Sequence, residues 1–377
     1  MNEMADMKIL ITGANGFIGK NLTVNLSLNP RLDLLLFDLP QTIEDLERLV
    51  HQADIVFHLA GVNRPENPDE FRSGNVGLTG MLLNMLEREN RNIPVVLSSS
   101  TQAVLDNPYG RSKKEAEDLV FEYAKKNSAP VYVYRFPNVF GKWCRPDYNS
   151  VVATFCNNAA KAVTLRIDDP AKELTLLYID DIITEFERVI NGAAEPQSGA
   201  LLSISPTYKI TLSDLAEIIN RFSDSRHSIT QDYDRNDPFI QKLYTTFISH
   251  INPDDLDVAA DMKSDERGFF AELVKSPHFG QISVSRTKPG MTRGGHWHNT
   301  KAEKFIVIEG NAVIRLRKIG SDEIIEYYVS GDNIQIVDIP PGYTHDIKNI
   351  GEADVMTVFW AGEIFDHENP DTYYEKV

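Results

Sequence analysis

The chain has 377 residues, more than one ordinary hydrophobic core supports, so its length predicts two domains. Its 42% hydrophobic and 25% charged residues are typical of a soluble globular protein. A formal net charge of −17 argues against nucleic acid or an acidic membrane surface as a partner, although a single pocket can still bind an anion.

Targeting and redox features indicate a cytoplasmic protein. No apolar run approaches the roughly 20 residues that cross a bilayer, and the start lacks the basic and then apolar segments of a signal peptide. The two cysteines, Cys144 and Cys156, give no disulfide framework. We therefore expect no membrane contact and expect both thiols to be small buried hydrophobes.

The first predicted element is a strand from Lys8 that ends in a glycine-spaced turn, after which a helix is predicted over 21–28. Glycines at this spacing let the backbone approach a pyrophosphate, whose charge then lies at the helix N-terminus. A second strand over 32–37 ends in Asp38, where a carboxylate is expected to bind a ribose 2′-hydroxyl. The sequence therefore predicts a dinucleotide site that includes Gly13, Asn15, Gly16, Phe17, Ile18, Gly19 and Asp38.

Strands and helices continue to alternate along the next part of the chain. Helices are predicted over 42–51 and 76–89, and strands over 54–59 and 94–98. Elements of these lengths favour right-handed βαβ units. The first part of the chain is therefore predicted to be an α/β, Rossmann-like, doubly wound parallel sheet.

A possible catalytic set follows the strand that ends near residue 98. Tyr109 and Lys113 are four residues apart, so they share one face of a helix. An ammonium beside a phenol favours the phenolate, and we therefore expect a lowered pKa for Tyr109 and a role for it in proton transfer at a carbonyl oxygen. A hydroxyl from Ser100 or Thr101 would hold that oxygen by a hydrogen bond.

These motifs, with the segments 58–61, 98–100, 135–141 and 178–181, resemble the extended short-chain dehydrogenases/reductases that act on nucleotide sugars. The resemblance implies a catalytic set of Tyr109 and Lys113 with Ser100 or Thr101. It further implies that Leu59, Ala60, Gly61 and Lys113 bind the cofactor and that Asn138 and Arg64 bind the substrate. The stretches 38–54 and 100–109 are shorter than that family usually has.

The identity of the nicotinamide cofactor stays open. The resemblance implies NADP(H). Asp38, with no arginine soon after it, favours NAD(H), because a carboxylate repels a 2′-phosphate.

The chain becomes polar and irregular over 223–257, apart from a helix predicted over 239–248. Beyond it the pattern changes to short strands of alternating character, predicted over 280–285, 304–309, 312–318, 323–329, 333–339 and 355–361. Such strands are typical of an antiparallel sandwich or barrel. We therefore predict a first domain over 1–245 and a second, all-β domain over 250–377.

The second domain contains a predicted metal site. His296 and His298 point to the same side of a strand because the side-chain period is two. Glu303 can return on the neighbouring strand, and His345 supplies a third imidazole. Imidazoles with one carboxylate suit Zn²⁺ or another divalent transition ion.

This layout resembles the cupin family, whose motif Gly-x5-His-x-His-x4-Glu-x6-Gly is matched from Gly290 to Gly310. The second cupin motif is matched at Pro340, Gly342, His345 and Asn349, and the resemblance implies a jelly roll. The segments 265–270 and 293–296 also resemble deoxysugar 3,5-epimerases, which are cupins that act on nucleotide 4-keto sugars. That comparison implies that His296 is the base and that Lys304 stabilises an enolate.

Taken whole, the chain resembles the bifunctional nucleotide-sugar enzymes of capsular polysaccharide synthesis. The resemblance implies a homodimer in which a UDP-linked 4-keto sugar is epimerised at C3 in the cupin. The sugar is then reduced at C4 by NADPH, giving a precursor of N-acetyl-L-fucosamine. A reductase with a purely structural, metal-stabilised cupin and a non-catalytic nucleotide-sugar sensor stay open, although the serine, tyrosine and lysine set argues against a sensor.

Overall fold

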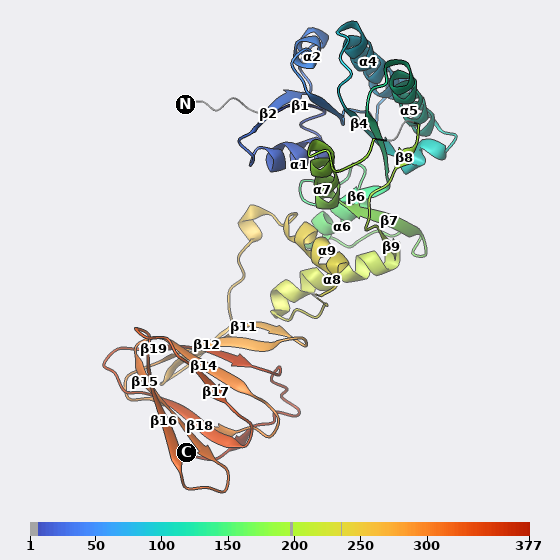
Figure 1. The fold of residues 1–377 in the computed structure, drawn as a ribbon. Helices are drawn as coiled ribbons and strands as arrows, with labels where there is room; N and C mark the ends of the chain where they lie inside the picture. The colour runs from blue at the N-terminus through green and yellow to red at the C-terminus, as the bar shows by residue number, and fades with distance from the viewer. Residues whose placement is uncertain (1–6, 197–198, 235) are drawn as a thin grey trace. The chain divides into compact units, whose positions relative to one another are not determined.

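The computed structural model describes residues 7–196, 199–234 and 236–377, which form two compact units (Figure 1). The first unit extends to Ile219 and includes Pro238–Ile251. The second comprises Asn220–Asp237 and Asn252–Val377. The stretch 220–237, which the sequence pattern assigns to the first domain, thus groups with the second unit.

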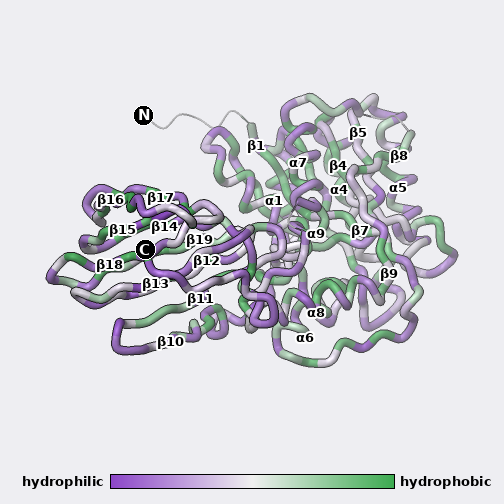
Figure 2. The backbone as a smooth tube through the Cα atoms, turned by 90° about the horizontal axis from the view of Figure 1, so that it is seen from below, coloured by the Kyte–Doolittle hydropathy of each residue, from purple (hydrophilic) through white to green (hydrophobic). Residues whose placement is uncertain are grey.

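The first unit is built on a six-stranded parallel sheet in the order β2-β1-β3-β4-β5-β8. Its strands are β1 (Met7–Thr12), β2 (Leu32–Phe37), β3 (Ile55–His58), β4 (Val95–Ser100), β5 (Val131–Phe136) and β8 (Leu201–Leu202). Buried parallel strands are continuous hydrophobic runs, as Figure 2 shows along β1. The predicted parallel α/β sheet is confirmed.

Helices cover both faces of this sheet (Figure 1). Strands β1, β3 and β5 share one core cluster with α2 (Ile43–Val50), α4 (Leu78–Arg88) and α5 (Pro108–Asn127). On the other face, α7 (Ile179–Ile190) packs beside α1 (Phe17–Leu26), and the tilted rings of Phe186 of α7 and Phe57 of β3 have centroids 4.9 Å apart. Helix α1 begins four residues before the predicted start because it follows the glycine turn directly.

A smaller sheet completes the first unit. Strands β6 (Asn138–Phe140) and β7 (Glu173–Tyr178) are parallel, and β9 (Tyr208–Thr211) pairs with β7 in the antiparallel sense. Three helices accompany this sheet: α6 (Val151–Ala160), α9 (Pro238–Ile248) and α8 (Leu212–Ser228), of which the part up to Ile219 belongs to the first unit. Lys242 of α9 bonds both carboxylate oxygens of Asp181 at 2.7 and 2.8 Å, which ties α9 to α7.

The second unit contains two antiparallel sheets that face each other, which confirms the all-β, cupin-like prediction. The first has the order β10 (Met262–Asp265), β11 (Gly268–Ser276), β12 (Gly280–Thr287), β19 (Val355–Ala361), β14 (Glu303–Glu309) and β17 (Ile336–Ile339). The second has the order β16 (Ile324–Ser330), β15 (Asn311–Lys318), β18 (Tyr343–Asn349), β13 (Thr292–Trp297) and β20 (Tyr373–Tyr374). Residues from both sheets, among them Phe305, Ile314 and Ile347, form the core between them.

Both cysteines are buried free thiols, as expected, and burial raises the pKa of each above its ordinary value. In the part of the chain that the structure describes, no helix combines the length and the apolar character needed to cross a bilayer.

Candidate nucleotide and metal sites

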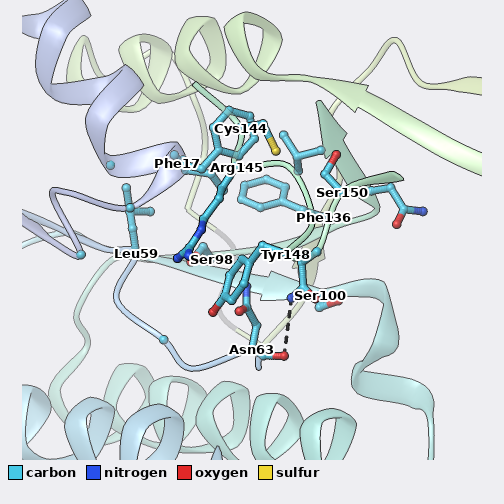
Figure 3. Close-up of a pocket in the computed structure, with 18 of the residues that line it drawn as sticks. Phe17, Leu59, Asn63, Ser98, Ser100, Phe136, Cys144, Arg145, Tyr148 and Ser150 are labelled. Atoms are coloured by element: carbon cyan, nitrogen blue, oxygen red, sulfur yellow. Dashed lines mark hydrogen bonds between the residues drawn. The ribbon is translucent and has the colours of Figure 1, made fainter. Parts of the chain in front are cut away.

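A cavity of about 680 Å³ in the first unit contains residues from the carboxyl ends of the central strands (Figure 3). This edge is where open α/β sheets bind ligands. The predicted residues that line it are Gly13, Asn15, Gly16, Phe17, Ile18, Gly19, Leu59, Gly61, Ser100, Tyr109, Lys113 and Asn138. The cavity thus brings the glycine turn together with the tyrosine and lysine.

The glycine turn has no space for side chains. Gly13 has a φ of +70°, and a Cβ on it would lie 2.6 Å from the backbone nitrogen of Ala60. A Cβ on Gly19 would lie 2.1 Å from the carbonyl oxygen of Gly13. Gly16 precedes α1 without a side-chain cap, so the first N–H groups of the helix are available to an anion.

Asp38 and Ala60 support this turn instead of lining the cavity. The carboxylate of Asp38 accepts hydrogen bonds from the backbone N–H of Asn15 at 2.7 Å and of Leu39 at 2.8 Å. The side chain therefore holds the turn against the end of β2.

The tyrosine and lysine lie in the first two turns of α5, whose N-cap is the Asn107 side chain. Lys113 is buried, and its ammonium donates to the Ser98 carbonyl at 3.1 Å. Burial lowers the pKa of Lys113 to about 8, although Glu117 raises it. Because Ser98 holds the ammonium, the predicted lowering of the tyrosine pKa is absent: burial raises the pKa of Tyr109, and only a hydrogen bond with Ser100 opposes it.

Two other predicted residues lie outside the cavity lining. Thr101 is exposed at the start of a 3₁₀ turn, so Ser100 is the hydroxyl that faces the cavity. Arg64 is exposed and donates to the backbone oxygens of Asp147, at 3.2 Å, and Tyr148. It therefore braces the loop that carries Tyr148.

Two cationic side chains that the sequence analysis did not identify, Arg145 and Lys20, line the cavity where Arg64 was expected. Arg145 lies over the Tyr148 ring, 5.3 Å from its centroid, and both are visible in Figure 3. Lys20 lies over the Trp143 ring at 4.9 Å. These side chains give the mouth of the cavity a positive charge that suits a nucleotide diphosphate. In the sequence, the only sign of this feature is that Arg145 directly follows Trp143-Cys144.

In the second unit, His296, His298, Glu303 and His345 meet, as predicted for the metal site. One possible ligand atom of each lies within 4.8 Å of the others. His298 Nε2 and His345 Nε2 lie 3.3 and 3.1 Å from Glu303 Oε2. The pairing of β13 with β18 sets His296 directly opposite His345.

The chemistry of this group fits a divalent transition ion. The Nε2 atoms of His298 and His345 and Oε2 of Glu303 are buried without an aligned hydrogen bond to the described residues. Burial alone would raise the pKa of Glu303, but the close imidazoles of His298 and His345 hold it well below its usual range. Burial and the neighbouring histidines lower the pKa of His296 to about 4, so its imidazole is neutral. A neutral imidazole at His296 and an ionised carboxylate at Glu303 are protonation states that bind Zn²⁺. Although burial lowers the pKa of His298, Glu303 raises it, so metal binding there would release a proton.

The predicted role of Lys304 at this site is wrong. Glu303 points into the cavity, so the next side chain on β14 points away. Lys304 pairs with Asp338 and is 42% exposed. The lysine that lines the cavity is Lys301, which is 5% exposed and donates to the Pro370 carbonyl at 3.3 Å.

These three histidines and the glutamate lie at a second cavity, of about 420 Å³. Lys263, Arg267 and Arg293 line it too and provide positive charge. Arg293 lies 3.5 Å from Asp265, and its Nε is buried without a hydrogen bond to the described residues. This cavity therefore suits an anionic ligand beside a metal ion.

These features define a Rossmann-fold oxidoreductase joined to a cupin-like domain that holds a cluster of three histidines and one glutamate. Residues 9–204 match the model of the NAD dependent epimerase/dehydratase family, and residues 263–373 match the polysaccharide biosynthesis C-terminal domain. The chain belongs to the NAD dependent epimerase/dehydratase family, which uses a nicotinamide cofactor.

Individual relatives share both parts of the chain. A protein of Pseudomonas aeruginosa, UDP-2-acetamido-2,6-beta-L-arabino-hexul-4-ose reductase, is 42% identical over 97% of this chain and 98% of its own length. The crystal structure of the capsular polysaccharide assembling protein CapF of Staphylococcus aureus is 44% identical, covers 100% of both chains and has a TM-score of 0.91. The spore coat polysaccharide biosynthesis protein SpsL of Bacillus subtilis is 32% identical over 29% of this chain and 78% of its own length.

Proposed function

We propose that this chain is a bifunctional nucleotide-sugar enzyme. The second unit epimerises C3 of a UDP-2-acetamido-2,6-dideoxy-4-hexulose, and the first unit reduces C4 with NAD(P)H. The product is an N-acetyl-L-fucosamine precursor for a capsular or surface polysaccharide. The observation that carries the proposal is the presence of two separate cavities, one with a serine, tyrosine and lysine set and one with three histidines and a glutamate. The name of the Pseudomonas relative supports the reduction.

In the reduction, the bound cofactor supplies a hydride to C4. Tyr109 donates its phenolic proton to the C4 oxygen, so the ketone becomes an alcohol and the phenolate remains. Ser100 orients that oxygen by a hydrogen bond, and the charged Lys113 would hold the cofactor beside it. Solvent then returns the proton to Tyr109. The raised pKa of Tyr109 keeps the phenol protonated before the substrate binds, as a proton donor requires.

For the cofactor we propose NADP(H), with NAD(H) as the alternative that Asp38 favours. Both oxygens of Asp38 already accept backbone hydrogen bonds, so this carboxylate has less capacity for a ribose hydroxyl than a free one. Lys113 and the start of α1 would hold either cofactor. Comparing the two reduced cofactors in the assay below decides between them.

In the epimerisation, the C4 ketone acidifies the C3 hydrogen, so this step must precede the reduction. His296 is neutral and lines the cavity, which suits a base that removes the C3 proton. Lys301 supplies the cation that faces the developing negative charge on the C4 oxygen. His298, Glu303 and His345, with or without His296, would hold Zn²⁺, which supplies Lewis acidity when bound.

The reduction is tested by mixing the full-length protein with the UDP-linked 4-keto sugar and NADPH or NADH and following the absorbance of the reduced nicotinamide. We expect oxidation by the natural protein and a loss of about 10²- to 10⁴-fold in Tyr109→Phe. Tyr123→Phe is the matched control, because Tyr123 lies on the same helix and bonds the Arg91 carbonyl away from the cavity. Equal rates in Tyr109→Phe and the control would contradict the role of Tyr109.

A reductase with a structural cupin is the second candidate. The burial of three ligand atoms between strands favours it, because a metal there would join β13, β14 and β18. It predicts metal binding and C4 reduction without exchange of the C3 hydrogen with solvent.

A further inference from the structure

The spacing of two possible metal ligands depends on one short loop. Residues 298–302 connect β13 to β14, with His298 as the first residue of this connection and Glu303 as the first residue of β14. Neither flanking strand fixes the path of these residues. Something else must hold the loop if His298 and Glu303 are to meet.

Asp371 provides that hold from the C-terminal part of the chain. Its Oδ1 accepts from the N–H of Asn299 at 2.9 Å. Its Oδ2 accepts from the N–H of Thr300 at 3.0 Å, the hydroxyl of Thr300 at 3.0 Å and the N–H of Lys301 at 3.1 Å. One carboxylate therefore binds three successive residues of the loop. Although burial raises it, these bonds hold the pKa of Asp371 at about 2, so the carboxylate is ionised.

The main chain of the same residue contacts His298. The Nδ1 atom of His298 lies 2.6 Å from the carbonyl oxygen of Asp371. A carbonyl can only accept, so Nδ1 carries a proton, and Nε2, the ring atom that lies toward Glu303, is the one left to bind a metal ion. The φ of Asp371 is +36°, a left-handed conformation that few side chains adopt readily. The structure tolerates this strain where it aims the carbonyl at the histidine.

We propose that Asp371 is a positioning residue for the metal site: its carboxylate sets the loop between His298 and Glu303, and its carbonyl fixes the tautomer and orientation of His298. The ligand served is a divalent transition ion. This inference rests on the metal site of the proposed function. Hydrogen bonds that orient metal ligands typically change metal affinity by about 10- to 100-fold.

The same residue fixes one wall of the cavity. Its neighbour Thr372, with Phe365, His367 and Tyr374, lines the cavity from the segment 363–374. When the carboxylate is lost, this segment and the loop 299–301 lose their shared anchor. The metal ligands and the wall are therefore expected to change together.

Three variants separate the carboxylate from backbone strain. Asp371→Gly removes the carboxylate and also relieves the strain of the left-handed backbone. If Asp371 acted through backbone strain alone, this variant would bind the metal as tightly as the natural protein. Asp371→Asn tolerates the same φ and keeps one acceptor oxygen, so it should rescue part of the function. Asp366→Asn is the matched control, because Asp366 lies in the same segment and accepts from Glu368 N–H at 2.8 Å.

The test is a titration of the metal-stripped full-length protein with Co²⁺, followed by its visible d–d absorption. We expect Asp371→Gly to bind Co²⁺ about 10- to 100-fold more weakly and with a changed spectrum, Asp371→Asn to lie between, and Asp366→Asn to match the natural protein. Cofactor binding by the first unit should stay unchanged in all three.

Natural affinity and spectrum in Asp371→Gly would overturn the inference while leaving the metal site in place. Absence of Co²⁺ binding by the natural protein would overturn the metal site, and the inference with it. If Asp371→Gly fails to fold, Asp371→Asn decides: an unchanged affinity and spectrum overturn the inference, and a weaker affinity with a changed spectrum supports it.

Discussion

At the scale of single residues, Lys301 and not Lys304 is the lysine that lines the second cavity. Lys301 and Lys304 lie on either side of Glu303, yet they face opposite directions. The sequence analysis chose Lys304 from family resemblance, because spacing alone does not show where a loop returns to the strand. In the structure Lys301 precedes β14 and is buried at the cavity, whereas Lys304 follows Glu303 on the strand and points outward.

This difference gives a matched pair of variants. We expect Lys301→Met to slow the exchange of the C3 hydrogen by about 10²- to 10³-fold, because it removes a charge that faces the developing oxyanion. Methionine keeps the apolar contact with the Phe365 ring, over which the ammonium lies at 5.5 Å. Lys304→Met should exchange at the natural rate. Exchange in D₂O followed by NMR measures both, and a larger loss in Lys304→Met would reverse the assignment.

Lys113 makes cofactor binding depend on pH. Burial lowers its pKa to about 8, with His58 and Glu117 as the charged or titratable groups that face it. Its charge is present below that value and is lost as the pH rises through it. From pH 7 to 9 the charged fraction falls from about 0.9 to about 0.1, so the affinity for the anionic cofactor should fall by up to about tenfold. A fluorescence titration at each pH measures this affinity for the cofactor.

The control for this effect is Lys113→Met. Its affinity should be lower at pH 7 and should not vary with pH between 7 and 9. A parallel decline in the variant and the natural protein would assign the titration to another group.

At the scale of elements, helix α5 carries the reactive residues and the ion pair that seats them. Tyr109, Lys113 and Glu117 follow at four-residue spacing and so share one face. Glu117 is 1% exposed and accepts from Arg135 of β5 at 2.7 and 2.8 Å and from Ser99 of β4 at 2.5 Å. The pair therefore fixes α5 against the two strands that lie beneath the cavity.

We expect Glu117→Gln to lower the free energy of unfolding by about 3 kcal/mol, because it leaves the Arg135 guanidinium without its buried counter-charge. Glu115→Gln is the control on the same helix. Its partner Arg72 is 80% exposed, so the loss should stay below about 1 kcal/mol. Urea denaturation compares the two. Similar losses of unfolding free energy in the two variants would show that burial of the Glu117–Arg135 pair does not add to stability.

The elements themselves were largely predictable from the sequence. Long hydrophobic runs and amphipathic helices identified β1 to β4 and their helices to within a few residues. In the second unit no strand was predicted over β10, β11, β18 or β20; all four residues of β10 are exposed, and β20 has only two residues. The directions of Arg64, Thr101 and Lys304 were not predictable, since they depend on loops that only the folded chain defines.

At the scale of the whole molecule, each unit has its own core and its own cavity. The sequence predicted two such parts because the pattern of elements changes along the chain. The sequence analysis assigned residues 220–237 to the first part, because a polar segment shows little of the hydrophobic periodicity that identifies a domain. The order of the two proposed reactions follows from chemistry alone, since reduction of C4 removes the ketone that acidifies C3.

The most direct test of two activities in one chain uses the UDP-linked 4-keto sugar in D₂O without reduced cofactor, with the C3 hydrogen followed by NMR. We expect the natural protein and Tyr109→Phe to exchange this hydrogen and His296→Ala to lose the exchange. Absence of exchange in the natural protein, with oxidation of NAD(P)H still seen when cofactor is added, would contradict the epimerase and leave a reductase with a structural cupin.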